Sequence, residues 1–347
     1  MKEDSTPRRD FLKRLGWTGL AVVGGTTGAL LLHDPRSGKE YFAEQREKAT
    51  VKLRDYRVDP STLKTSMAIA HGKDPARLVQ AVLAEMGGME KFVAPGDVVV
   101  IKPNVAFDRP PQLGATSNPE VLKPLVRACF EAGARTVLIA DNPINQPAGC
   151  FLKSGIQAAA EEVGATVMYP KPSSFRDLAV GRIRTRTDGS EQVVGERGEV
   201  LDVWPMFFEP FQEATKVIGL APCKDHNLCH ASMTMKNWYG LLGGNRNQFH
   251  QKIHDIIADF PRMIKPTLVL LDGTRVLMSN GPTGGRLSDV KEAHTLVASI
   301  DMVAADAYGY SELLGRNLDD LTYVEKASQA GLGTKDWKSL RPREVTV

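Results

Sequence analysis

The sequence predicts an α/β protein whose largely parallel sheet is flanked by helices. Three short apolar runs have the length and the bounding residues of buried strands, and they cover 98–101, 137–140 and 166–169. Helical patterns separate these runs, so strands and helices alternate along the chain. Such alternation is typical of parallel strands joined by crossover helices, and it indicates Rossmann-like lobes.

The predicted helices carry clear start and stop signals. Asn118 and Pro119 stand where an N-cap and a first helical residue are expected, and that helix ends near Gly133. A second helix covers about 151–163 and stops at Gly164. These signals place both helices between strands, as the fold class requires.

The alternation returns in the second half of the chain. Strands are expected at 217–220, 267–271 and 294–300, with a helix at about 249–260. Asp301 is placed to cap a last helix that runs to about Leu314. The second half therefore continues the same α/β pattern.

Residues 180–204 interrupt this rhythm. Polar and apolar residues alternate from Arg182 to Thr187, and Asp188-Gly189 follows as a turn signal. We expect a small antiparallel hairpin insertion here.

Polar residues follow four of the predicted strands. Lys102 and Asn104 follow the first, Asp141 the second, and Asp272 a later one, while the fourth leads into a segment that contains Lys224. Ligands of open parallel sheets bind beyond the carboxyl ends of the strands. We therefore expect a polar crevice in which Lys224 and Lys236 bind a carboxylate or phosphate, or act as bases.

Histidines and a cysteine in the same region suggest a transition-metal site. The candidate ligands are His226, Cys229, His230, His250 and His254. Within one helix, a spacing of four would place the last two imidazoles on one face. The alternative is that these histidines pack or lie at the surface. Gln251 stands where a zinc peptidase would have glutamate, which disfavours that chemistry.

Charge and cysteine content exclude several classes of protein. The net charge is +3, of which residues 1–32 carry +2, so the remainder is close to neutral and a nucleic-acid-binding surface is disfavoured. The spacing of the cysteines is scattered, without Cys-x-x-Cys or a ferredoxin-type run; they are Cys129, Cys150, Cys223 and Cys229. Disulfide pairing after export and four free thiols both remain open.

The N-terminal residues resemble a twin-arginine export signal. Arg8 and Arg9 precede Asp10-Phe11-Leu12-Lys13, with Pro7 where the motif prefers serine or threonine, and residues 17–32 carry no charge. The resemblance implies export of the folded protein by the twin-arginine translocase to the periplasm or another extracytoplasmic space. The apolar run is shorter than the roughly 20 residues of a spanning helix, and both cleavage and retention as an anchor remain open.

These observations divide the chain into four parts. They are a signal or anchor at 1–32, a linker at 33–65, an α/β domain at 66–330 and a C-terminal tail at 331–347. We expect any contact with a membrane to involve only the first part.

The order of several segments resembles the family called domain of unknown function 362. The segments are Ile101–Asn104, Lys224–His226, Thr234–Gly240, Leu271–Gly273, Gly281–Gly285 and Ser299–Ala307. The chain keeps the family's Lys-x-His and Lys-Asn elements as Lys224, His226, Lys236 and Asn237. Many relatives carry an appended iron–sulfur ferredoxin, whose cysteine run is missing from these 347 residues. The resemblance implies the fold and a polar site.

The first functional hypothesis is an exported enzyme that acts on a small anionic molecule, with a metal or redox cofactor inserted before export. Its catalytic candidates are Lys224, His226, Lys236 and Asp272, and its cofactor-binding candidates are Lys102, Asn104, Asp141 and Asn237. A fold-level analogy with nickel-dependent lactate racemase adds one variant, proton abstraction beside a carboxylate. The alternative is a periplasmic ligand-binding or cofactor-delivery protein without turnover, and electron transfer ranks last.

Overall fold

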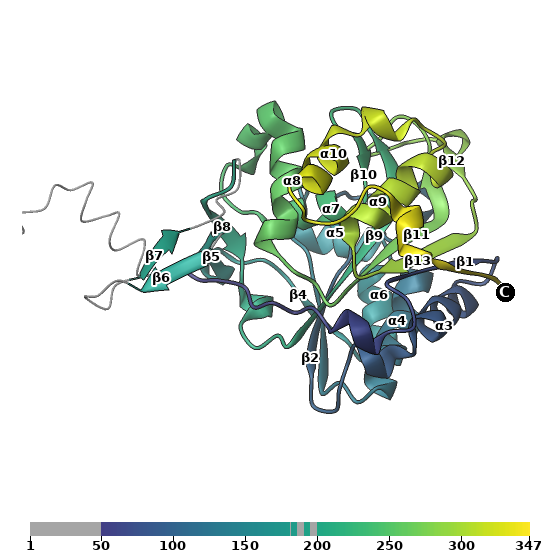
Figure 1. The fold of residues 1–347 in the computed structure, drawn as a ribbon, viewed down its shortest axis with the longest axis horizontal. Helices are drawn as coiled ribbons and strands as arrows, with labels where there is room; N and C mark the ends of the chain where they lie inside the picture. The colour runs from purple at the N-terminus through teal and green to yellow at the C-terminus, as the bar shows by residue number, and fades with distance from the viewer. Residues whose placement is uncertain (1–49, 181, 186–190, 195–199) are drawn as a thin grey trace, which may run out of the picture. The chain divides into compact units, whose positions relative to one another are not determined.

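A ten-stranded sheet forms the centre of the described chain, which comprises residues 50–180, 182–185, 191–194 and 200–347 of the computed structural model (Figure 1). Its main path has the strand order β14-β1-β13-β11-β9-β2-β3-β4. In that order the strands are Arg343–Thr346, Met67–His71, Thr295–Ser299, Leu268–Leu277, Lys216–His226, Val98–Lys102, Thr136–Ala140 and Thr166–Met168.

Neighbours on this path pair in parallel, except that β13 is antiparallel to both β1 and β11. The short strands β10 (His230–Ser232) and β12 (Val290–Lys291) pair antiparallel with β9 and β11. The prediction of a largely parallel α/β fold is therefore confirmed. Residues from Ala49 onward form one compact unit around this sheet.

Helices cover both faces of the sheet (Figure 1). One face packs against α3 (Pro75–Met86), α4 (Pro119–Glu131), α5 (Pro147–Lys153) and α6 (Ile156–Glu162). The other packs against α7 (Thr234–Asn237), α8 (Ile253–Met263), α9 (Met302–Tyr308) and α10 (Thr322–Gln329). Alternate side chains of β2 enter the two cores, Val99 and Ile101 on one side and Val100 on the other. Strands buried on both faces explain the uninterrupted apolar runs in the sequence.

The predicted helix caps are confirmed. The Asn118 side chain accepts the Glu120 amide hydrogen, and Pro119 is the first residue of α4. Asp301 accepts the amide hydrogens of the second and third residues of α9, at 2.8 and 3.0 Å. Helix α9 continues as a π-helical turn at Gly309–Leu313, so it extends nearly as far as expected.

Two predicted helices differ from those observed. The helix expected at 151–163 is divided into α5 and α6 because Gly155, at φ 74°, separates them. The helix expected at 249–260 begins as a 3-10 segment, Arg246–Lys252, and becomes α-helical only at Ile253. This second difference changes the interpretation of His250 and His254.

The hairpin insertion is confirmed. Strands β6 (Arg182–Thr185) and β7 (Glu191–Val194) pair antiparallel, while their Asp188-Gly189 turn lies outside the described residues. A second antiparallel pair, β5 (Phe175–Ala179) and β8 (Val203–Phe207), flanks it in sequence. The segment 331–347, expected to be a tail, contributes β14 to the edge of the main sheet.

The export signal at 1–32 and the first part of the linker, 33–49, lie outside the described residues. In the described part of the chain, no helix has the length and apolar character to cross a membrane. All four cysteines are buried free thiols, so no disulfide joins them.

Candidate functional site

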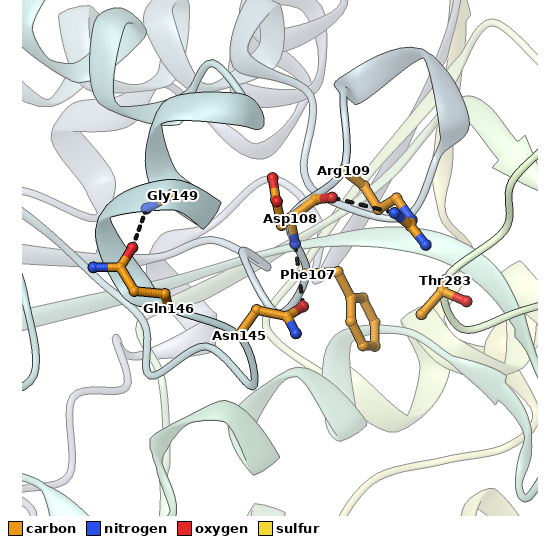
Figure 2. A pocket seen from close by; sticks show the side chains of 7 residues that line it. All are labelled: Phe107, Asp108, Arg109, Asn145, Gln146, Gly149 and Thr283. Atoms are coloured by element: carbon orange, nitrogen blue, oxygen red, sulfur yellow. Dashed lines mark hydrogen bonds between the residues drawn. The ribbon is translucent and has the colours of Figure 1, made fainter.

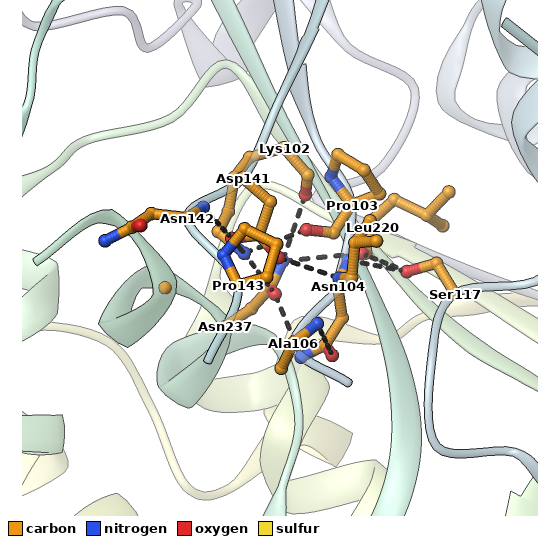
Figure 3. Close-up of polar contacts among 12 residues, drawn as sticks. Lys102, Pro103, Asn104, Ala106, Ser117, Asp141, Asn142, Pro143, Leu220 and Asn237 are labelled. Carbon is orange, nitrogen blue, oxygen red and sulfur yellow. Dashed lines mark hydrogen bonds and ion pairs between the residues drawn. The ribbon is translucent and has the colours of Figure 1, made fainter. Parts of the chain in front are cut away.

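A buried ion pair lies at the carboxyl ends of β2 and β3. Lys102 Nζ lies 2.7 Å from Asp141 Oδ1, with side-chain exposures of 0% and 1%. The same ammonium donates to the side-chain oxygen Oδ1 of Asn237 and to the backbone oxygen of Pro103, each at 2.8 Å (Figure 3). Burial lowers the pKa of Lys102, and Asp141 opposes that shift. Because three acceptors already surround its ammonium, Lys102 is not free to bind a ligand. The Lys102–Asp141 ion pair and its hydrogen-bond partners instead hold the strand ends together, and they form a unit called the brace.

The other members of the predicted cofactor-binding set complete this brace (Figure 3). Asn237 Nδ2 donates to the backbone oxygens of Lys102 and Leu220 at 3.0 and 3.3 Å. Asn104 Nδ2 donates to Asn237 Oδ1 at 3.3 Å. Asp141 Oδ2 accepts the Val105 amide hydrogen at 2.7 Å. The four predicted residues are therefore brought together, and their polar atoms bind one another.

Gly240 permits this brace to close. A Cβ at position 240 would overlap Asp141 Oδ1 and lie 2.8 Å from Lys102 Nζ. Only a residue without a side chain leaves room for the pair at its present spacing.

Lys224 is the second buried lysine of the site. Its Nζ donates to the Ala115 carbonyl at 2.5 Å and to Asn104 Oδ1 at 3.4 Å, and it lies 5.1 Å from the centre of the Phe107 ring. Among the described residues, no carboxylate forms an ion pair with it. Burial, aided by the positive charges of Lys236 and Lys102, lowers the pKa of Lys224 to about 7.

Lys236 is the third lysine of the site. Its Nζ lies 4.8 Å from the centre of the Tyr239 ring, and within the described ranges it forms no ion pair. Burial lowers its pKa; the buried thiol of Cys229 opposes this shift, and Arg246 adds to it. Lys224 and Lys236 thus form a pair of cations without a neutralising carboxylate.

His226 is a neutral hydrogen-bond donor beside these lysines. Its Nδ1 accepts the Leu228 amide hydrogen at 3.1 Å, so the neutral ring carries its proton on Nε2. Burial, followed by the charges of Lys236 and Lys224, lowers the pKa of His226 to about 2. The ring stays uncharged at working pH.

In the part of the chain that the structure describes, no group of three or more His, Cys, Asp or Glu side chains has a metal-binding arrangement, so the predicted ligands are not brought together into one site. His250 stacks on Tyr239, at 5.6 Å between ring centres. His254 belongs to α8 and stacks on His230, at 5.8 Å. The reason is the helix boundary at Ile253, which removes the i, i+4 geometry.

The chemistry of the donors also does not fit a cation. The Cys229 thiol is buried and donates to the Ala231 carbonyl at 3.2 Å, and burial raises its pKa to about 11. Lys224 and Lys236 act electrostatically on His226, so a metal cation here would be repelled by two positive groups.

Asp272 caps local backbone. It accepts hydrogen bonds from the amide and hydroxyl of Thr274, at 2.9 and 2.6 Å, and from the Asn118 amide at 3.2 Å. Burial raises its pKa. These hydrogen bonds fix the start of α4, and none of them goes to Lys224 or His226.

Two structural partners of the site escaped the sequence analysis. Arg246 donates to the carbonyls of Asn142, Pro143 and Leu242 at 3.0 to 3.1 Å and holds their loops together. Asp306 accepts the Thr234 and Met235 amide hydrogens at the start of α7, the helix that carries Lys236. Burial raises the pKa of Asp306 to about 7. An aspartate inside the apolar helix α9 was the available signal.

A pocket of about 290 Å³ opens beside this site (Figure 2). Phe107 lines it and also contacts Lys224. The lining residues are Phe107, Asp108, Arg109, Asn145, Gln146, Gly149 and Thr283. Lys224 therefore lies near a space of small-molecule size.

The fold and the site together define an α/β protein with buried lysines at the carboxyl edge of its sheet. Residues 99–311 match the model of the domain of unknown function DUF362, and the chain belongs to that family. The family resemblance in the sequence is thereby confirmed.

Individual relatives are distant. A thylakoid-associated protein of Synechocystis is 26% identical over 283 residues, which cover 78% of this chain and 80% of the relative. A solved Thermotoga maritima protein has 13% identity, a TM-score of 0.33 and coverage of 62% of this chain and 54% of its own. Lactate racemase apoprotein from Thermoanaerobacterium thermosaccharolyticum has 13% identity, a TM-score of 0.30 and coverage of 70% and 57%. The matches span less than two thirds of either solved chain.

Proposed function

We propose that this protein is an enzyme that binds a small anionic molecule between Lys224 and Lys236. The observation that carries the proposal is that the charge of Lys236 helps to lower the pKa of Lys224, while neither lysine forms an ion pair with a carboxylate of the described residues. Buried charges in proteins are normally paired, because an unpaired one is strongly destabilising. A carboxylate or phosphate of a ligand supplies the missing negative charge.

The same geometry supports a role in proton transfer. With a pKa of about 7, Lys224 is partly a free amine at neutral pH and accepts a proton from a bound molecule. The Nε2–H group of His226 donates to an oxygen on which negative charge develops. We infer that the reaction removes a proton from carbon beside a carboxylate and returns one, which balances without any co-reactant.

Lys236→Met is expected to weaken the binding of a small carboxylate by roughly 10- to 100-fold. Loss of one hydrogen bond from a charged group is worth about 1.5–3 kcal/mol. Calorimetric titration of the full chain with three- to five-carbon carboxylates measures the change. Lys216→Met, at the opposite end of β9, is the matched control and leaves affinity unchanged. Equal affinities in the Lys236 variant and wild type would refute the proposal.

Recovery of the bound ligand separates the enzyme from the alternative. Conversion of the ligand, measured as exchange of its α-proton for deuterium from the solvent, supports an enzyme. Tight binding with quantitative recovery of unexchanged ligand favours a binding or delivery protein without turnover.

We also propose export by the twin-arginine translocase, supported by the Arg8-Arg9-Asp10-Phe11-Leu12-Lys13 pattern. The description of the Synechocystis relative as thylakoid-associated fits a protein that works at or beyond a membrane. Replacement of both arginines by lysine is expected to leave the protein in the cytoplasm, as measured by fractionation. Lys13→Arg is the charge-preserving control. Unchanged export of the double variant would disprove this route.

A further inference from the structure

The pocket beside Phe107 contains a third cation without a neutralising carboxylate. Arg109 Nε is buried and finds no hydrogen-bond partner among the residues that the structure describes, and Nη1 donates to the Asp108 carbonyl at 3.5 Å. The Asp108 carboxylate lies 3.4 Å from Lys153. In the described part of the chain, Arg109 therefore forms no ion pair, although it lines a pocket of about 290 Å³.

Besides the Asp108 carboxylate, which Lys153 partly neutralises, the remaining polar groups of this pocket offer hydrogen-bond donors. Asn145 Oδ1 accepts the Asp108 amide hydrogen at 3.4 Å, and Gln146 Oε1 accepts the Gly149 amide hydrogen at 2.6 Å. Because both side-chain oxygens are engaged, the two NH₂ groups are left as donors. The Thr283 hydroxyl is a further donor on the side of the pocket where Phe107 and Arg109 lie (Figure 2). Such a lining matches an anionic group.

Two contacts link the wall of the pocket to the surroundings of Lys224. Phe107 belongs to the pocket wall, and its ring centre lies 5.1 Å from Lys224 Nζ. Thr283 belongs to the loop whose Gly281 amide donates to Asp225 Oδ2 at 2.8 Å, and Asp225 directly follows Lys224 in β9. Phe107 is thus shared by the pocket that Arg109 lines and by the surroundings of Lys224.

We propose that this pocket is a second anion subsite and that the ligand is a small dianion. One anionic group binds Lys224 and Lys236, the second binds Arg109 with Thr283, and a short apolar segment between them packs on Phe107. Dicarboxylates and phosphorylated carboxylates have this chemistry. The volume of the pocket lies at the lower end of the range for small-molecule sites and suits one such group with a few carbons. This inference rests on the proposed function of the two lysines.

Matched pairs of mono- and dianions test the proposal by calorimetric titration of the full chain. The pairs are propionate with malonate, butyrate with succinate, and 2-hydroxybutyrate with malate. We expect at least one dianion to bind wild type about tenfold or more tightly than its partner. Arg109→Met is expected to abolish that preference and leave the monoanion affinity unchanged, while Arg109→Lys retains part of it. Arg135→Met, an exposed arginine at the start of β3, is the control.

The outcomes separate this proposal from the one on which it rests. A dianion preference that survives in Arg109→Met overturns the second subsite, even if Lys236→Met still weakens every ligand. Equal affinity of wild type for both members of all three pairs also overturns it. Failure of all six compounds to bind overturns both proposals.

Discussion

Asp141→Asn is expected to lower the free energy of unfolding by about 3–5 kcal/mol, because it leaves the Lys102 ammonium buried and unneutralised. The replacement keeps the shape of the side chain and one oxygen that can accept the Val105 amide hydrogen. The loss therefore reports the charge and not a cavity. Urea denaturation at neutral pH, analysed as a two-state transition, measures it.

Two further variants control this experiment. Asp108→Asn removes an exposed carboxylate that lies 3.4 Å from Lys153, and it should change stability by less than about 1 kcal/mol. Adding Lys102→Met to Asp141→Asn should restore part of the lost stability, because the uncompensated charge is gone. If Asp141→Asn proves no more destabilising than Asp108→Asn, the buried pair is not the brace described above.

Lys224→Met is expected to reduce proton exchange on a bound carboxylate by at least about 100-fold, since it removes the base. In wild type, the exchange rate should rise as pH increases through about 7, because the deprotonated amine is the active form. Lys224→Arg keeps the positive charge for anion binding but cannot give up its proton. It should therefore bind the ligand and show no such rise. Deuterium exchange followed by NMR measures both variants.

A stability measurement gives an independent check on Lys224. Its pKa of about 7 in the folded protein is below the ordinary lysine value of 10.5, so between these values the unfolded chain binds more protons. The contribution of Lys224 to the free energy of unfolding therefore increases as the pH rises from about 7 to about 10.5. Asp306, whose pKa is raised to about 7, has the opposite effect at lower pH, between 3.8 and 7. Identical pH dependence of wild type and Lys224→Met above pH 7 would show that this lysine is not perturbed.

The fold was predictable because its signals are local. The apolar run 98–101 is long enough for a buried strand, and the Asn118 and Asp301 caps act within their own first turns. The order of the strands was not predictable, because it depends on which strands pair across the chain. In particular, β13 lies between β1 and β11, which are about 200 residues apart in sequence.

The site was predictable only in its composition. Sequence order placed Lys102 and Lys224 at the same sheet edge, but their different roles depend on Asp141, which contacts only the first. The histidine spacing failed as a guide because a 3-10 segment precedes the helix that starts at Ile253. Arg246 could not be assigned at all, since its partners are backbone carbonyls from distant loops.

The requirement for glycine at position 240 allows the brace to be recognised in other members of the family. A side chain at that position and the Lys102–Asp141 pair at its present spacing exclude each other, because the added Cβ would occupy the space of the charged atoms. The glycine is therefore a third component of the ion pair, although it carries no charge. In an alignment of the family, positions 102, 141 and 240 should change together: a chain with alanine or a larger residue at the third must have lost or moved the charges at the first two.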